Sequence, residues 1–219
     1  MTAARAHRAS IEGAAGVIEI AYALPAQPAA IAVVAHPHPL FGGTMDNKVV
    51  TTLAKAFTDA GAATFRFNFR GVGASEGRHD EGRGETDDYL EVAAHAARAI
   101  GERPLWMAGF SFGGSVALRA SVRADFARLV LVAPAFRRIT GHGLGEAPDP
   151  RDPGLGAPGR HGSANTVIVH GSKDETTPLA DSLAWGEVRD VPVLVVPGAD
   201  HFFHRRLHVI RDTVTRLAR

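Results

Sequence analysis

Short apolar runs alternate along this chain with segments in which apolar residues recur at helical spacing. Five of the runs are almost wholly apolar, which is typical of parallel strands buried on both faces of a sheet. They cover residues 31–35, 105–108, 129–133, 166–169 and 193–196. Residues 63–69 indicate a further strand. Residues 17–22 alternate apolar and polar positions instead, and predict an antiparallel strand paired with residues 9–12.

Helices are expected between these strands, at residues 47–60, at 87–100 and from about 204 to 217. In the first of them Val50, Leu53 and Phe57 fall on one face, and Gly61 ends the pattern. The alternation of strands and helices predicts an α/β fold, with a mostly parallel, doubly wound sheet covered by helices on both faces. We expect residues 1–219 to form a single domain.

Residues 137–163 interrupt this alternation. The segment is rich in glycine and proline and has no apolar periodicity. We interpret it as a long loop that could cover a site at the sheet edge, and not as a second domain.

Composition and charge narrow the class of protein. A length of 219 residues suits one α/β domain with a proper core. The net charge of +1 gives no reason to expect nucleic-acid or membrane partners. The absence of cysteine excludes a disulfide framework, a cysteine nucleophile and cysteine-ligated metals. No secretory signal is visible, and the apolar stretch 26–35 is too short to span a bilayer, so we expect a cytoplasmic protein.

Polar residues with chemical potential follow the predicted strands. The carboxyl ends of parallel strands meet at one edge of a sheet, where functional residues gather. The residues in question are His36 and His38, Asn68 and Arg70, Ser111, His170 and Asp174, and Asp200 and His201. The sequence therefore predicts a site at this edge.

Ser111 is the centre of a G-x-S-x-G pentapeptide at residues 109–113, between a predicted strand and a helix. With 24 glycines in the chain, the pentapeptide alone is weak. In the strand–turn–helix context it predicts a strained turn that exposes the serine hydroxyl. Side chains at Gly109 or Gly113 would collide with the neighbouring strand or helix, and the helix start directs free N–H groups at a developing negative charge.

A nucleophilic serine needs a base, and the base needs an orienting acid. The chain order Ser111, Asp174, His201 places both partners after later strands. His201 would take the Ser111 proton, and Asp174 would fix the imidazole tautomer. Asp200 and Asp181 are alternatives for the acid, although Asp200 adjoins His201 and is expected to point away from it. His204 and His208 are alternatives for the base.

The remaining histidines and acidic residues also admit other interpretations. The spacing of His201, His204 and His208, and the pair His36 and His38, could suit a metal, but we expect none. His204 and His208 fit a solvated helix face, and His36 and His38 fit packing and hydrogen bonding in their loop. His170 is expected to brace the loop that carries Asp174. The acidic residues Asp80, Glu81, Glu85, Asp87 and Asp88 are expected on a solvated face and at a helix start.

The chain resembles the α/β-hydrolase superfamily, in its small bacterial branch of dienelactone-hydrolase-like proteins and predicted esterases. The motifs that carry the resemblance are HPHPLFGGTMDNKVV, FRFNFRGVGASEG, GFSFGG, HGSKDETTP and GADHFFH, which together extend over most of the chain. The resemblance implies an α/β-hydrolase fold with a minimal lid. Dienelactone hydrolases use a cysteine where this chain has Ser111, so ordinary ester or thioester chemistry is expected instead.

The resemblance also implies an oxyanion hole made by two backbone N–H groups. In this superfamily the residue after the nucleophile, here Phe112, supplies one. The other comes from the loop after residue 35, where Pro37 and Pro39 have no N–H. His38 is the preferred donor and Leu40 the alternative.

The predicted function is hydrolysis of small carboxylic esters or thioesters through an acyl-enzyme, without a cofactor. The partner would be a small-molecule acyl ester. Two alternatives stay open: an acyltransferase that uses the same three residues, and a non-catalytic binding protein on the same fold.

Overall fold

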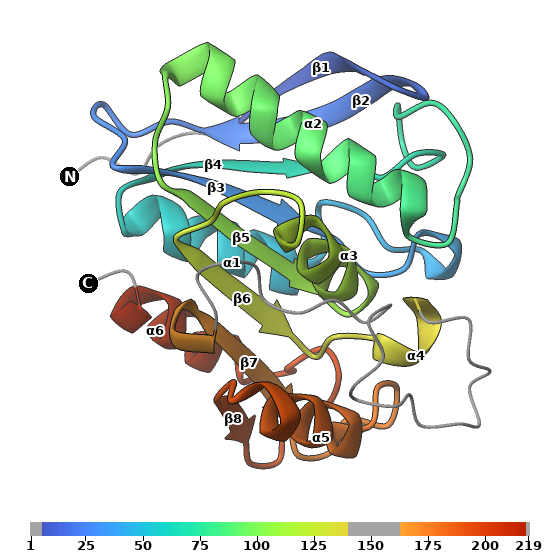
Figure 1. The fold of residues 1–219 in the computed structure, drawn as a ribbon, viewed down its shortest axis with the longest axis vertical. Helices are drawn as coiled ribbons and strands as arrows, with labels where there is room; N and C mark the ends of the chain where they lie inside the picture. The colour runs from blue at the N-terminus through green and yellow to red at the C-terminus, as the bar shows by residue number, and fades with distance from the viewer. Residues whose placement is uncertain (1–5, 140–162, 218–219) are drawn as a thin grey trace.

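One eight-stranded sheet runs through the computed structural model, which describes residues 6–139 and 163–217 (Figure 1). The strand order is β1-β2-β4-β3-β5-β6-β7-β8. The strands are β1 His7–Gly13, β2 Gly16–Ala23, β3 Ala30–Ala35, β4 Ala62–Phe67, β5 Leu105–Phe110, β6 Arg128–Val132, β7 Thr166–Gly171 and β8 Val193–Val196. The strands β3 to β8 are parallel, as the apolar runs predict.

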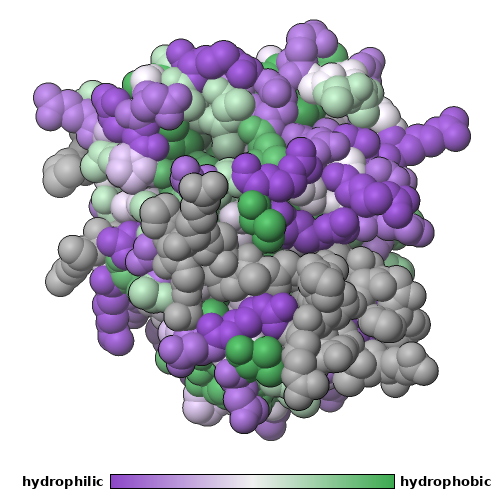
Figure 2. Space-filling model, in the orientation of Figure 1, coloured by the Kyte–Doolittle hydropathy of each residue, from purple (hydrophilic) through white to green (hydrophobic). Residues whose placement is uncertain are grey.

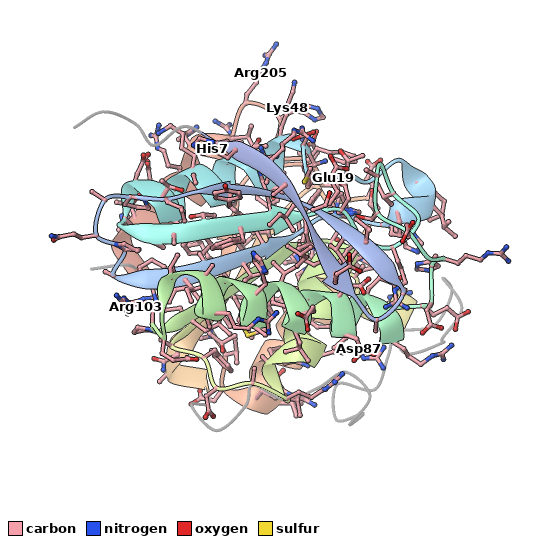
Figure 3. All side chains as sticks on the ribbon, turned by 90° about the horizontal axis from the view of Figure 1, so that it is seen from above. His7, Glu19, Lys48, Asp87, Arg103 and Arg205 are labelled. Atoms are coloured by element: carbon pink, nitrogen blue, oxygen red, sulfur yellow. The ribbon has the colours of Figure 1, made fainter. Side chains whose placement is uncertain are left out.

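The first two strands form an antiparallel hairpin at one edge of the sheet, on the side from which Figure 3 is viewed. β2 also pairs antiparallel with β4. Four of the first five residues of β1 are exposed, and Ile11 is the buried one. This hairpin confirms the predicted lead-in strand and its partner, with β1 longer than the expected residues 9–12.

Helices cover both faces of the sheet. α1 and α6 pack against each other on one face, whereas α2, α3 and α5 lie on the other (Figure 1). The helices are α1 Lys48–Asp59, α2 Arg83–Ile100, α3 Phe112–Ser121, α4 Phe136–Ile139, α5 Leu179–Arg189 and α6 Leu207–Leu217, with short 3-10 turns at Pro39–Phe41 and Ser163–Asn165. The doubly wound arrangement is confirmed.

The core consists of two apolar clusters, one on each side of the sheet. β3 shows why a parallel strand is continuously apolar, because its residues alternate between the clusters. Ile31 and Val33 join the cluster under α2 and α3, whereas Ala32 and Val34 join the cluster under α1 and α6. All six residues of β3 are buried.

A buried tyrosine ties α2 to the middle of the sheet. The Tyr89 hydroxyl donates to the Val33 carbonyl at 2.6 Å and accepts the Ala108 N–H at 3.0 Å. It therefore bridges the paired strands β3 and β5. Burial raises the pKa of Tyr89 well above its ordinary value, so the hydroxyl stays protonated and can donate.

The face of the molecule that is seen in Figure 1 is mainly polar. Outside the grey residues, hydrophilic side chains are spread among small apolar ones, and no broad apolar patch is visible there (Figure 2). None of the helices in the described part of the chain is both long and apolar enough to cross a membrane.

The start of α2 differs from the prediction. The helix begins at Arg83 and not at residue 87. Gly82 has a left-handed φ of 86°, and the Glu85 carboxylate accepts its N–H at 2.8 Å, which caps the helix earlier. Glu85 lies at the helix start as expected, but the expectation that Glu85 and Asp88 are solvated is wrong, because both side chains are buried.

Two other segments bear on the site. Residues 140–162 of the expected loop lie outside the described residues, and the residues that flank them form α4 and a 3-10 turn. The last helix, α6, begins at Leu207 and not near residue 204. His204 consequently lies in the turn before the helix and shares no helix face with His208.

Candidate active site

Loops from four strands meet around one cavity at the carboxyl-terminal edge of the sheet. The cavity has a volume of about 300 Å³. Pro37, His38 and Phe41 line it from the loop after β3, and Ser111 lines it from the turn after β5. Thr176 enters from the loop after β7, and His201 and Phe202 from the loop after β8. The predicted edge therefore carries a cavity that holds the predicted serine and histidine.

Ser111 occupies a strained turn between β5 and α3. Its φ is 56° and its ψ is −120°, which is unusual for a residue with a side chain. The turn is held because the Ser111 N–H donates to the Val132 carbonyl at 2.9 Å, and the Ser111 carbonyl accepts the Ala135 N–H at 3.1 Å. Only 6% of the residue is exposed, so the hydroxyl lies at the floor of the cavity.

The glycines beside this turn are required by close backbone approach. A Cβ on Gly109 would lie 2.0 Å from the Gly113 carbonyl oxygen. A Cβ on Gly113 would lie 2.4 Å from the His36 carbonyl oxygen and 2.6 Å from the Ala35 carbonyl carbon. The collisions predicted from the pentapeptide are thus present, the first with α3 and the second with the end of β3.

The His201 ring lies between Ser111 and Asp174. Its Nε2 is 3.1 Å from the Ser111 Oγ, and its Nδ1 is 2.7 Å from Asp174 Oδ2. Since a carboxylate can only accept, Nδ1 carries the proton and Nε2 is the acceptor that faces the serine. The ring can therefore receive the Ser111 proton while the carboxylate stabilises the resulting positive charge.

Asp174 is held by several donors besides His201. Its Oδ1 accepts the N–H groups of Thr176 and Thr177, each at 2.8 Å, and its Oδ2 accepts the Thr177 hydroxyl at 2.9 Å. Burial by itself would raise the pKa of the Asp174 carboxyl. Hydrogen bonds from His170 and His201, together with the charge of His201, outweigh burial and lower the pKa well below its ordinary value. The group is therefore a stable carboxylate.

His170 braces the loop between β7 and α5, as expected from the sequence. Its ring is fully buried, with Nδ1 2.8 Å from the Ser182 hydroxyl and Nε2 3.0 Å from the Thr177 carbonyl. The same Nε2 is 3.4 Å from Asp174 Oδ2. His170 thus fixes both ends of the turn that presents Asp174.

The alternative candidates for the acid and the base do not join Ser111 in the structure. Asp200 accepts from the His204 ring at 2.6 Å and from the His204 N–H at 3.0 Å. Asp181 pairs with Arg137 at 2.7 Å. His208 is exposed on α6. The structure brings Ser111, Asp174 and His201 together and leaves these alternatives outside the group.

His36 shapes the loop after β3 from below. Its Nε2 accepts the Phe69 N–H at 2.9 Å, so its Nδ1 carries the proton and donates to the Pro37 carbonyl at 2.6 Å. Burial lowers the pKa of His36 to about 4, and the ring is neutral. It acts as a structural link between the ends of β3 and β4.

The amide candidates for an oxyanion hole lie on two sides of Ser111. Phe112 is the first residue of α3, and N–H groups in the first turn of a helix have no partner within that helix. The Leu40 N–H donates to His38 Nδ1 at 3.3 Å. His38 is among the described residues that line the cavity, and Leu40 is not. This geometry favours His38 over Leu40.

Two residues that contact the candidate site residues Asp174 and His38 were not identified from the sequence. Thr177 binds Asp174 through both its N–H and its hydroxyl, and His79 packs against His38. A signal for Thr177 does exist, because an Asp followed closely by threonines is typical of a turn closed by its own carboxylate. No local signal brings His79 to this place.

A cluster of side chains that could bind a metal ion is not found in the described part of the chain. Within residues 6–139 and 163–217 there is no group of three or more histidine or acidic side chains arranged to hold one.

Comparison with known proteins relates the whole chain to hydrolases. The family model described as "Hydrolase_4: Serine aminopeptidase, S33" matches residues 26–147. The uncharacterised protein RP471 of Rickettsia prowazekii (strain Madrid E) is 33% identical over 200 residues, which are 87% of this chain and 79% of the relative.

Two solved structures are similar over nearly the full length. An α/β serine hydrolase homologue from Coxiella burnetii is 36% identical with a TM-score of 0.81, covering 96% of each chain. XC6422 from Xanthomonas campestris, described as an α/β serine hydrolase without lid, is 32% identical with a TM-score of 0.82. That similarity covers 97% of this chain and 93% of XC6422.

Proposed function

Because the chain belongs to the serine aminopeptidase (S33) family of α/β hydrolases and is therefore a hydrolase, we propose that it cleaves small carboxylic esters or thioesters through an acyl-enzyme on Ser111. The observation that carries the proposal is the continuous hydrogen-bonded line from Ser111 through His201 to Asp174, with heavy-atom distances of 3.1 Å and 2.7 Å. A serine in such a line has the base that its weakly nucleophilic hydroxyl needs.

In the acylation step the Ser111 Oγ attacks the carbonyl carbon of the ester, and its proton passes to His201 Nε2. The carbonyl oxygen becomes an oxyanion, which the backbone N–H groups of Phe112 and His38 would stabilise. The carbon–oxygen or carbon–sulfur bond of the leaving group then breaks, and the His201 proton goes to the leaving alcohol or thiol.

In the deacylation step a water molecule takes the place of the leaving group. His201 removes a proton from the water, whose oxygen attacks the acyl carbon. The tetrahedral intermediate collapses, Ser111 regains its proton from His201, and the carboxylic acid leaves. Asp174 stays ionised throughout and stabilises the imidazolium in both steps, which its lowered pKa supports.

The cavity supports a small, apolar acyl or alcohol group. Its volume of about 300 Å³ lies at the lower end for small-molecule sites. Two aromatic rings at its rim are open to solvent, Phe41 with 70% and Phe202 with 46% of the residue exposed. A short or aromatic apolar group can cover these rings.

The family description names an aminopeptidase, but the lining of the cavity favours an ester over a peptide with a free amino terminus. None of the described residues that line it carries a carboxylate to bind an α-ammonium group. Glu175 lines a neighbouring cavity of about 440 Å³ instead.

The test compares wild type, Ser111→Ala and Ser115→Ala on p-nitrophenyl acetate and butyrate. Ser111→Ala is expected to abolish turnover and labelling by a fluorophosphonate probe, with the fold retained. Ser115 is a matched control, because it is a buried serine one turn along α3 whose Oγ has no hydrogen-bond partner among the described residues. Ser115→Ala is expected to keep wild-type rates.

Several outcomes would contradict the proposal. Undiminished turnover by Ser111→Ala would remove the serine from the reaction. Failure of the probe to label wild type would favour the non-catalytic binding protein. Faster turnover of aminoacyl p-nitroanilides than of esters would replace the substrate class, and transfer of the acyl group to added alcohols or amines in preference to water would indicate an acyltransferase.

A further inference from the structure

His79 contacts both residues whose amides are the candidates for the oxyanion hole. It lies in the loop between β4 and α2, and its ring centroid is 4.9 Å from that of His38 and 5.4 Å from that of Phe112. The His38 and Phe112 rings also touch each other, with centroids 4.7 Å apart. The three rings form one cluster, which we call the His79 ring cluster.

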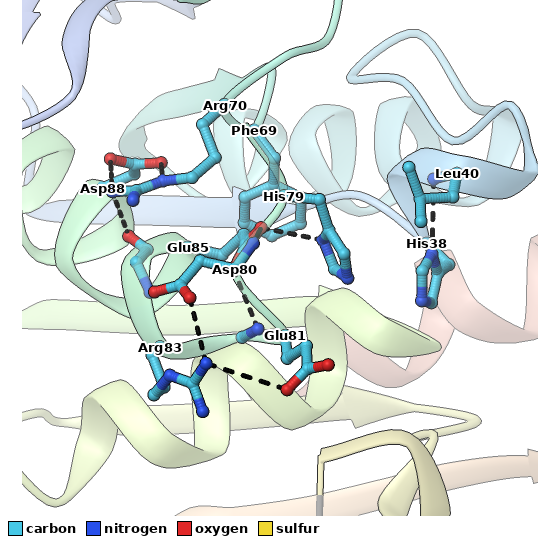
Figure 4. A network of polar contacts seen from close by, with 12 residues as sticks. His38, Leu40, Phe69, Arg70, His79, Asp80, Glu81, Arg83, Glu85 and Asp88 are labelled. Atoms are coloured by element: carbon cyan, nitrogen blue, oxygen red, sulfur yellow. Dashed lines mark hydrogen bonds and ion pairs between the residues drawn. The ribbon is translucent and has the colours of Figure 1, made fainter. Parts of the chain in front are cut away.

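A buried carboxylate holds His79 in this position. The His79 Nδ1 is 2.9 Å from Glu85 Oε1, and Glu85 is fully buried in the first turn of α2 (Figure 4). The same carboxylate accepts the N–H groups of Asp80 at 2.9 Å and of Gly82 at 2.8 Å. Both carboxylate oxygens are therefore bound, so the anchor of the His79 ring cannot rotate freely.

The start of α2 is itself fixed to the end of β4. The Arg70 guanidinium binds both oxygens of Asp88, at 2.9 Å and 2.8 Å, and also donates to the Gly84 carbonyl at 2.8 Å (Figure 4). Such a bidentate pair fixes orientation as well as distance. Through Glu85, the position of His79 is thus tied to the sheet.

The contacts of the His38 ring show how its loop is connected to the rest of the fold. On its other side, the His38 ring meets Phe41 at a centroid distance of 4.9 Å and accepts the Leu40 N–H. These are contacts within its own short loop. Its contacts with the rings of His79 and Phe112 connect that loop to the loop before α2 and to the start of α3.

An oxyanion hole works only when its donors are preorganised. The N–H groups must lie 2.7–3.1 Å from the position that the oxyanion will take, and loss of one donor costs about 10²–10³ in rate. Two donors on separate loops keep this spacing only if the loops are held at a fixed separation. In the His79 ring cluster the rings of His38 and Phe112 join these two segments directly, and the His79 ring packs against both of them.

We propose that His79 is a positioning residue, whose ring, anchored by Glu85, sets the separation between the His38 and Phe112 amides. This inference rests on the proposed esterase function and deepens it. His79 touches no reacting atom in this scheme and acts through the two donors. Its removal therefore weakens stabilisation of the tetrahedral intermediate more than it weakens substrate binding.

Three variants test this, with p-nitrophenyl butyrate as substrate. His79→Ala is expected to lower kcat by about 10- to 10²-fold with KM within about twofold, because the donors are displaced and not removed. His79→Phe loses the hydrogen bond to Glu85 but keeps a ring packed against His38 and Phe112, and is expected to stay within about fivefold of the wild-type kcat. Arg83→Ala is the control from the same network, an exposed side chain that pairs with Asp80 and Glu81, and is expected to be unchanged.

A second readout separates positioning from general loosening of the loop. Affinity for an alkyl boronic acid, which mimics the tetrahedral intermediate, is expected to fall in His79→Ala by the same factor as kcat/KM. Thermal unfolding of each variant reports its fold. If His79→Ala does not fold, His79→Phe decides by the same fivefold limit.

The proposal is overturned if folded His79→Ala keeps the wild-type kcat, or if folded His79→Phe loses as much as His79→Ala. It is also overturned if boronic acid affinity is unchanged while kcat falls. A wild-type protein without esterase activity would instead overturn the proposed function, and this inference with it.

Discussion

Asp174 illustrates how much a single side chain depends on its surroundings. Its two oxygens accept hydrogen bonds from the Thr176 and Thr177 backbone, from the Thr177 hydroxyl and from His201. Asp200, next to His201 in sequence, faces away and binds His204. Asp200 is next to His201 in the sequence, but Asp174 is the aspartate that contacts the His201 ring in space. Only Asp174 is therefore expected to act as the acid that orients His201.

Exchange of Asp174 for asparagine tests its role. Asp174→Asn is expected to lower kcat by about 10⁴, because an amide NH₂ can hold His201 in the wrong tautomer and cannot stabilise its positive form. Initial rates on p-nitrophenyl butyrate measure the change. Asp200→Asn is the matched control, and a loss of similar size there would contradict the assignment of the acid.

His36 predicts a pH dependence of stability. Its pKa in the folded protein is about 4 because of burial, against an ordinary value of 6.5. Between these pH values the unfolded chain binds a proton that the folded chain excludes. The free energy of unfolding is therefore expected to fall as the pH is lowered from about 6.5 to 4, by up to about 3 kcal/mol from this residue.

Urea unfolding between pH 7 and pH 4 checks this dependence. His36→Gln is expected to be less stable at neutral pH, yet to lose less stability on acidification than wild type. His208→Gln changes an exposed histidine and should keep the wild-type slope. An unchanged slope in His36→Gln would show that other groups carry the acid sensitivity.

At the scale of single residues, the sequence identifies the serine, histidine and aspartate that the structure brings together better than it identifies the side chains that hold this region in place. Ser111, Asp174 and His201 stand out because each follows a strand and because their types complement one another. The apolar pattern does not reveal that Glu85 and Asp88 are buried, because it does not show that His79 and Arg70, in the loop before α2, fold back onto them. Burial of a charge is decided by the partners that the folded loop brings to it, and periodicity does not report them.

Among the elements, the junction of β5 and α3 places a strict steric demand on the sequence. Gly113 lets the first turn of α3 pass directly over the end of β3, with the His36 carbonyl oxygen 2.4 Å from where a Cβ would be. Gly114, the next residue, has more room, since its nearest neighbour would be the Gly109 carbonyl oxygen at 3.2 Å.

This difference predicts different effects of two alanine substitutions. Gly113→Ala is expected to lower the free energy of unfolding by about 1–3 kcal/mol or more and to abolish esterase activity, because α3 must move away from β3. Gly114→Ala should change it by less than about 1 kcal/mol, since the tighter contact is offset by the helix preference of alanine. Urea unfolding and initial rates measure both, and equal effects would refute the steric argument.

Helix ends were predicted less well than helices. The apolar spacing identifies α1, α2 and α6, but α2 begins four residues earlier and α6 about three residues later than expected. The end of a helix is set by its caps, and here a glycine with left-handed φ and the Glu85 carboxylate fix the start of α2. Such caps add little to the periodic pattern from which the helix is predicted.

For the whole molecule, alternation of strands and helices was enough to predict the α/β class and the doubly wound sheet. It could not give the strand order, in which β4 lies between β2 and β3. It also could not assign α1 and α6 to one face and α2, α3 and α5 to the other. These features follow from the packing of distant segments, yet the site could be anticipated without them, because every parallel strand brings its carboxyl end to the same edge.

The course of the chain has a practical consequence for handling the protein. β1 starts beside the end of β2, which pairs with the first half of β4, and α6 runs back from the carboxyl-terminal edge (Figure 1). β1 therefore begins, and α6 ends, at the amino-terminal edge of the sheet, on the side opposite the cavity. A protein tethered to a bead or electrode near the start of β1 or the end of α6 would present its cavity outward to the surrounding solution.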